Sequence, residues 1–139
     1  MRQIALIVAA IAASAAGPKA IQGDFNGDGK ADTAKLAKFQ QETPNPVLVA
    51  NPWKLSKSAP RVGSLGILVT FGGMEQMPIF VADADFFGSP MWQKPEGDMV
   101  RAQKRGKGHA IAVATESGAD ELLVWTGRGW KVVPGEDMP

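Results

Sequence analysis

Residues 23–32 constrain this chain more than any other segment, because they space oxygen-bearing side chains around glycines. The segment reads Gly-Asp-Phe-Asn-Gly-Asp-Gly-Lys-Ala-Asp, and Gly29 permits the sharp backbone reversal that a tight loop needs. The oxygen donors that this spacing offers are the carbonyl of Lys30 and the side chains of Asp24, Asn26, Asp28 and Asp32. Hard divalent cations take about six to eight oxygen ligands. The spacing therefore predicts a metal-binding loop over residues 24–32, with calcium as the ion.

Two kinds of calcium loop share this spacing, and the flanking residues distinguish them. An EF-hand has a helix that leads into the loop and a bidentate glutamate at the twelfth loop position. The twelfth position here is Lys35, and too few residues separate Pro18 from Asp24 to form a stable helix. The sequence therefore gives little support to an EF-hand.

Residues 21–39 instead resemble the calcium loop of FG-GAP or VCBS-type repeats, which occur in β-rich secreted proteins. The ligands that this resemblance implies are the carbonyl of Lys30 and the side chains of Asp24, Asn26, Asp28 and Asp32. The chain carries a single copy of the loop, whereas a closed propeller needs at least about four blades. A propeller is therefore excluded, and the overall plan looks like that of small uncharacterised exported bacterial proteins, a likeness that implies no activity.

The same residues also suit an acidic turn that binds nothing, because Asp, Asn and Gly are common turn residues. Two observations favour the metal site instead. Asp24, Asp28 and Asp32 would repel one another without a cation, and every ligand position of the pattern is filled. Loops in extracellular modules bind calcium at about 0.1–1 mM, so the ion would be structural rather than a signal.

The first 16 residues have the pattern of a secretory signal peptide. Arg2 precedes an apolar run over residues 4–13, and the small residues that follow offer cleavage after Ala15 or Ala16. The run is shorter than the roughly 20 residues that span a bilayer, and a buried N-terminal helix is the alternative. The sequence thus predicts a signal peptide over residues 1–16, a single β-rich domain over residues 17–139, and a periplasmic or secreted protein.

The charges of the chain nearly balance, with 15 basic and 14 acidic residues. Loss of Arg2 with the signal peptide brings the mature chain close to neutrality, so no general attraction to nucleic acid or membranes is expected. The expected partner is an unknown protein or another component of the cell envelope, without nucleic acid and without membrane insertion after signal cleavage. The chain has no cysteine, and a bound ion would supply part of the stabilisation that disulfides give other exported proteins.

Beyond the loop, short apolar runs alternate with glycine and proline, which is typical of β-strands. Residues 33–39 suit either a strand or a helix, and the resemblance favours a strand. Prolines flank residues 47–50 and indicate an edge strand. Further strands are predicted over residues 65–71, 78–82 and 110–115, the first of them central. The predicted fold class is therefore mostly β, a small antiparallel sheet or sandwich that begins with the calcium loop.

Residues 121–133 contain the clearest β-hairpin. Two apolar runs flank Gly127-Arg128-Gly129, a three-residue loop that sets the register of the strands. Trp125 and Trp130 flank this turn, so they lie either near each other across the strands or on opposite faces. We expect these large side chains to pack in the core rather than to bind a ligand.

Residues 90–108 interrupt the strand pattern and predict a long exposed loop. They contain a basic run, which is either a solvated surface or a contact for an acidic partner. Its members are Arg101, Lys104, Arg105 and Lys107. Phe86 and Phe87 lie just before this segment, and the turn there either exposes one ring to a partner or buries both.

Few groups suited to catalysis are present. The chain has no cysteine and one histidine, His109, which follows a flexible Gly-Lys-Gly sequence. A carboxylate pair of the glycosidase type leaves no local signature. The candidates for such a pair are Asp83, Asp85, Asp98 and Glu116. We therefore expect no enzyme but an exported calcium-binding β domain, a binding or interaction module with structural calcium. The alternative is a periplasmic inhibitor or immunity protein that blocks a cell-wall hydrolase with residues 86–88 or the basic stretch near Lys104.

Overall fold

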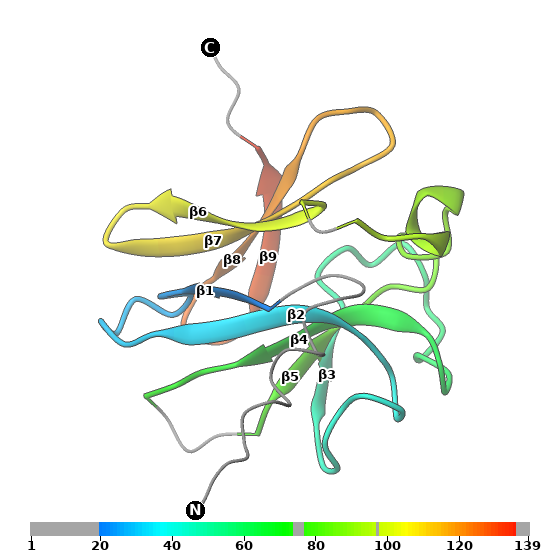
Figure 1. Ribbon diagram of the computed structural model, residues 1–139, viewed down its shortest axis with the longest axis horizontal. Helices are drawn as coiled ribbons and strands as arrows, with labels where there is room; N and C mark the ends of the chain where they lie inside the picture. The colour runs from blue at the N-terminus through cyan, green and yellow to red at the C-terminus, as the bar shows by residue number, and fades with distance from the viewer. Residues whose placement is uncertain (1–19, 74–76, 97, 136–139) are drawn as a thin grey trace, which may run out of the picture.

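The computed structural model describes residues 20–73, 77–96 and 98–135, which form two packed β-sheets (Figure 1). The predicted signal peptide over residues 1–16 lies outside the described residues. Within them, no helix is both long enough and apolar enough to cross a membrane. The mostly β fold class that the sequence predicts is confirmed.

The N-terminal sheet has five strands in the order β1-β2-β4-β5-β3, all antiparallel except for the β3–β5 pair. Its strands are β1 (Ile21–Gly23), β2 (Asp32–Lys38), β3 (Leu48–Ala50), β4 (Leu65–Thr70) and β5 (Ile79–Val81). β4 lies inside the sheet and β3 at its edge, which confirms both predictions. The segment that suited either a strand or a helix forms β2. Its two-residue alternation places Asp32, Ala34 and Leu36 on one side, where Asp32 and Ala34 are buried and Leu36 is partly buried.

The C-terminal sheet is an antiparallel meander of four strands in the order β6-β7-β8-β9. Its strands are β6 (Val100–Arg105), β7 (Gly108–Val113), β8 (Glu121–Trp125) and β9 (Trp130–Pro134). β8 and β9 form the predicted C-terminal hairpin, and Trp125 pairs directly with Trp130 across it. The two indoles lie 5.3 Å apart in an edge-to-face arrangement, and Trp130 is buried in the core, as expected of packing residues.

The main core lies between the two sheets. Ile67, Val69 and Val81 of the N-terminal sheet and Ile111, Val113 and Leu123 of the C-terminal sheet are almost completely buried in one cluster. Burial of each such side chain contributes about 1.5–3 kcal/mol. The opposite face of β7 carries Ala110 and Ala112, which pack in a separate cluster with Leu122. β7 therefore has an Ile/Val face toward the main core and an alanine face on the opposite side.

The prediction of a long exposed loop over residues 90–108 is wrong. Pro90–Gln93 form a short 3-10 helix, η2, with Trp92 buried, and residues 100–105 form strand β6 with Val100 buried. The basic residues gave this strand the composition of an exposed loop. In the structure Lys104 and Arg105 are exposed, while Val100 and Ala102 contact the core. His109 is likewise not in a flexible segment, since it lies within β7.

Phe86 and Phe87 belong to an aromatic cluster beside η2. Phe86 stacks on Trp53 at 4.3 Å between ring centres, and Phe87 meets Trp92 edge-to-face at 4.9 Å. Phe87 is buried and Phe86 partly buried. Of the two arrangements that the sequence left open, the turn therefore adopts the one that packs both rings.

Candidate metal centre

The candidate metal loop connects β1 to β2 at one end of the N-terminal sheet (Figure 1). Gly27 and Gly29 have positive φ angles of 76° and 86°, which L-amino acids with side chains seldom adopt. Asp24 organises the turn between them, because its Oδ1 accepts a hydrogen bond from Asp28 N (3.0 Å) and its Oδ2 accepts one from Gly29 N (2.8 Å). The reversal that the sequence predicted at Gly29 is therefore present.

The loop brings three carboxylates together. Asp24, Asp28 and Asp32 each offer an oxygen, and these oxygens all lie within 4.8 Å of one another. Two ligands of one calcium ion at about 2.3–2.6 Å are separated by no more than about 5 Å. The spacing of the three carboxylates therefore fits a single cation, and this acidic cluster could hold a metal ion.

The other two predicted ligands lie in the same turn. The side-chain oxygen of Asn26 accepts a hydrogen bond from Asp28 N at 3.3 Å. Lys30 N donates to Asp28 Oδ1 at 2.9 Å, so Lys30 is fixed next to an acidic member of the cluster. Each carboxylate oxygen has two lone-pair directions, and acceptance of one backbone hydrogen bond leaves the second for an ion.

Asp32 differs from the other two acids because it is completely buried. Its Oδ2 accepts a hydrogen bond from Phe25 N and its Oδ1 one from Gly72 N, both at 2.8 Å. Asp32 thus connects the start of the loop to the turn that follows β4. Its first role is structural, and it can bind an ion only in addition to these two hydrogen bonds.

Contacts with the C-terminal sheet also hold the loop in place. Asp24 N donates to His109 Nδ1 at 3.0 Å, and His109 N donates to the carbonyl of Asp24 at 2.8 Å. The ring of His109 also meets that of Phe25 edge-on, 6.5 Å away. No sequence pattern predicts this contact, because 85 positions separate the two residues and a single histidine forms no motif. His109 therefore positions the loop.

Gly108 gives this contact a simple test. A Cβ atom on Gly108 would lie 2.4 Å from the carbonyl oxygen of Asp24, a distance at which the backbone of one strand must move. We expect Gly108→Ala to lower the free energy of unfolding by about 1–3 kcal/mol through this overpacking. Urea unfolding measures the change. Gly129→Ala in the turn between β8 and β9 is the control, because a Cβ atom there meets no atom within 4 Å and Gly129 does not have a positive φ angle. Equal losses in the two variants would contradict close packing at Gly108.

Comparison with known protein families, curated proteins and solved structures found no match. The geometry of the chain itself therefore carries the functional argument.

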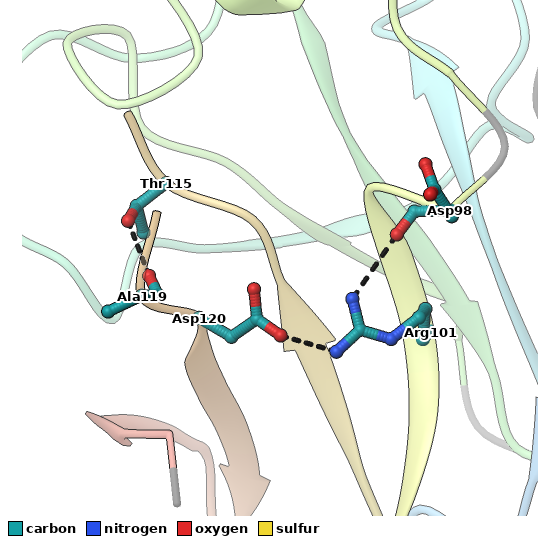
Figure 2. Close-up of polar contacts among 5 residues, drawn as sticks. All are labelled: Asp98, Arg101, Thr115, Ala119 and Asp120. Carbon is teal, nitrogen blue, oxygen red and sulfur yellow. Dashed lines mark hydrogen bonds and ion pairs between the residues drawn. The ribbon is translucent and has the colours of Figure 1, made fainter. Parts of the chain in front are cut away.

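The basic residues of the predicted loop do not form one patch. Arg101 forms an ion pair with Asp120 and also donates from Nη1 to the carbonyl of Asp98 at 3.3 Å (Figure 2). Thr115 donates to the carbonyl of Ala119 beside this pair, which fixes the turn that carries Asp120 (Figure 2). Lys104 and Arg105 are exposed at the far end of β6. Arg101 therefore serves the fold rather than a basic surface.

Asp83 is the most highly bonded of the carboxylates considered for catalysis. It is 2 % exposed, and its oxygens accept hydrogen bonds from the backbone N–H groups of Leu55, Ser56, Asp85 and Phe86 at 2.7–3.0 Å. Burial raises the pKa of Asp83, but the hydrogen bonds from Phe86, Ser56, Asn51 and Leu55 outweigh burial and hold this pKa below its ordinary value. Asp85, Asp98 and Glu116 are exposed. The bonding of Asp83 indicates a structural carboxylate.

Proposed function

We propose that this protein is an exported β domain that uses calcium for structure and acts by binding rather than by catalysis. The single observation that carries the calcium assignment is the convergence of Asp24, Asp28 and Asp32 within 4.8 Å on one glycine turn. Carboxylate and amide oxygens are hard ligands, and they favour calcium over softer transition metals. When bound, the ion would offset the mutual repulsion of these acids.

The position of the loop explains why an ion there would stabilise the whole domain. Asp32 connects the loop to Gly72 in the N-terminal sheet, and Asp24 connects it to His109 in the C-terminal sheet. An ion that holds Asp24 and Asp32 together would therefore strengthen contacts to both sheets. A chain without cysteine has no disulfide to do this.

Calcium is expected to raise the thermal midpoint of the mature chain, residues 17–139, by roughly 10 °C. An ion at a hundredfold excess over its dissociation constant contributes about 2.7 kcal/mol to a domain of this size. Scanning calorimetry in excess chelator and in about 10–100 mM calcium, a hundredfold excess over the expected dissociation constant of about 0.1–1 mM, measures the shift. Asp28→Ala should abolish it, because Asp28 is exposed and contributes mainly to the acidic cluster.

Glu116→Ala is the matched control for this experiment, since it removes an exposed acid outside the loop and should keep the full calcium shift. A wild-type midpoint that is the same in calcium and in chelator would refute the calcium assignment. A shift that Asp28→Ala preserves would place the ion elsewhere in the chain.

A further inference from the structure

A groove of about 660 Å³ lies on the outer face of the N-terminal sheet, which points away from the C-terminal sheet. Val49, Phe80 and Leu68 are paired across neighbouring strands and so share a face, and Phe80 and Leu68 belong to the apolar cluster of that outer face. The apolar part of the groove includes Val49, Phe39 and Ala82. Its volume is within the range of about 300–1,000 Å³ that small-molecule sites occupy.

Hydrogen bonds hold the first part of one wall of the groove, residues 54–58. Lys54 has a φ angle of 58°, an uncommon conformation for a residue with a side chain, and its N–H donates to Asn51 Oδ1 at 2.9 Å. The next two N–H groups, of Leu55 and Ser56, donate to the buried Asp83. The lining is therefore formed before any ligand arrives, which lowers the ordering cost of binding.

The polar groups that line the groove are mostly cations and hydrogen-bond donors. Lys54 and Lys57 line it, and neither forms an ion pair within the described residues. Ser56 Oγ and Ser64 Oγ accept hydrogen bonds from Ser58 N and Arg61 N, and in the described part of the chain neither hydroxyl donates one. A hydroxyl that accepts from the backbone still has its proton to donate.

Among the described residues, the lining of the groove includes one acidic residue, Asp83, and its oxygens already have hydrogen-bond partners. Asp83 accepts four backbone hydrogen bonds, so its oxygens are not left to bind a cationic ligand. An anion would instead find two lysines and two hydroxyl protons near an apolar surface. The complementarity of charge therefore specifies a negatively charged ligand.

We propose that this groove binds a small amphiphilic anion, a molecule with one carboxylate, sulfonate or phosphate group on an apolar body. The apolar body would cover Phe39, Val49 and Ala82, while Lys54 and Lys57 hold the anionic head. This site gives the binding role proposed above a location. It shares no residue with the calcium loop, so the calorimetric test of calcium and the test of the groove can fail separately.

Two fluorescent probes that differ in charge test the groove. Anilinonaphthalene sulfonate is an apolar anion, and phenylnaphthylamine has the same rings without the charge. We expect the sulfonate to bind the folded protein saturably in calcium and to weaken as salt rises. The double variant Lys54→Asn with Lys57→Gln should weaken sulfonate binding about tenfold and leave phenylnaphthylamine unchanged. Laurate and lauryl phosphate should each displace the sulfonate, and their relative strength distinguishes the two head groups.

Lys104→Gln with Lys131→Gln is the matched control, because it removes two exposed charges from the C-terminal sheet. Val49→Glu is a second test of the groove. It places a carboxylate at a half-exposed groove position, and repulsion between the two negative charges should also weaken sulfonate binding. Equal losses in the groove and control pairs would overturn the proposal. So would displacement of the sulfonate by a glutamate-rich peptide but not by laurate, which would assign the groove to a protein partner.

Discussion

Replacement of Asp83 by alanine is expected to destabilise the protein by about 3–5 kcal/mol, the largest effect of any single substitution considered. The carboxylate accepts hydrogen bonds from four backbone N–H groups that belong to two separate segments, residues 55–56 and 85–86. Alanine would leave these donors without acceptors, and each buried unsatisfied donor costs about 1–3 kcal/mol before relaxation. Relaxation and water entry keep the total below the simple sum.

Urea unfolding at neutral pH measures this loss, with Asp85→Ala as the control. Asp85 is also an aspartate of the same turn but is exposed, so its replacement should change stability by less than about 0.5 kcal/mol. Asp83→Asn keeps one carbonyl oxygen and should give an intermediate loss. A change below 1 kcal/mol in Asp83→Ala would mean that the 51–56 segment does not depend on this carboxylate.

The same residue predicts how stability varies with pH. Its pKa in the folded protein is lowered, so the ionised form contributes stability that is fully present above the unfolded pKa of about 3.9. This contribution is lost as the pH falls through the lowered pKa of the folded state. The stability difference between wild type and Asp83→Asn should therefore be constant at neutral pH and shrink below about pH 4. A difference that grows on acidification would contradict the lowered pKa.

Asp32→Ala is expected to produce the second large loss, about 2–4 kcal/mol, even in chelator. Its carboxylate is completely buried and accepts the N–H groups of Phe25 and Gly72, so alanine would leave both without a partner. Asp28→Ala should lose little stability in chelator, because Asp28 is exposed and, within the described residues, its side chain accepts a hydrogen bond only from Lys30 N in its own turn.

Calorimetry of both variants, with and without calcium, separates the structural from the ion-binding role. In calcium, both variants should lose the shift, and Asp32→Ala should remain the less stable of the two. Identical midpoints for the two variants in chelator would show that the hydrogen bonds of Asp32 contribute nothing beyond the acidic cluster.

Local patterns predicted much of this fold. The central strand β4, the proline-flanked edge strand β3 and the glycine turn between β8 and β9 each depend on residues next to one another, and each prediction is confirmed. The clustering of Asp24, Asp28 and Asp32 was predictable for the same reason, because a glycine-rich turn of nine residues determines it. Metal binding itself, the nature of the ion and the partner of the protein stay predictions.

The features that the sequence did not reveal depend on contacts between distant segments. β6 was missed because its basic side chains face outward and only Val100 is buried among its residues. The role of His109 depends on a residue 85 positions away. Asp83 resembled any surface aspartate in sequence. Two of its four donors come from the return of residues 55–56 to the end of β5, and the other two lie in its own turn. Long-range hydrogen bonds of this kind have no periodic signature.

The hydrogen bonds between Asp24 and His109 also bear on the order of folding. A ribosome releases the loop long before residue 109, so the loop cannot complete its contacts until most of the chain is available. Closure of so long a stretch of chain is entropically unfavourable until neighbouring strands have formed. We expect the β7–β8–β9 meander, whose contacts are local in sequence, to form first. β1 would then be among the last strands to reach its final position in the fold, although it is among the first to be synthesised.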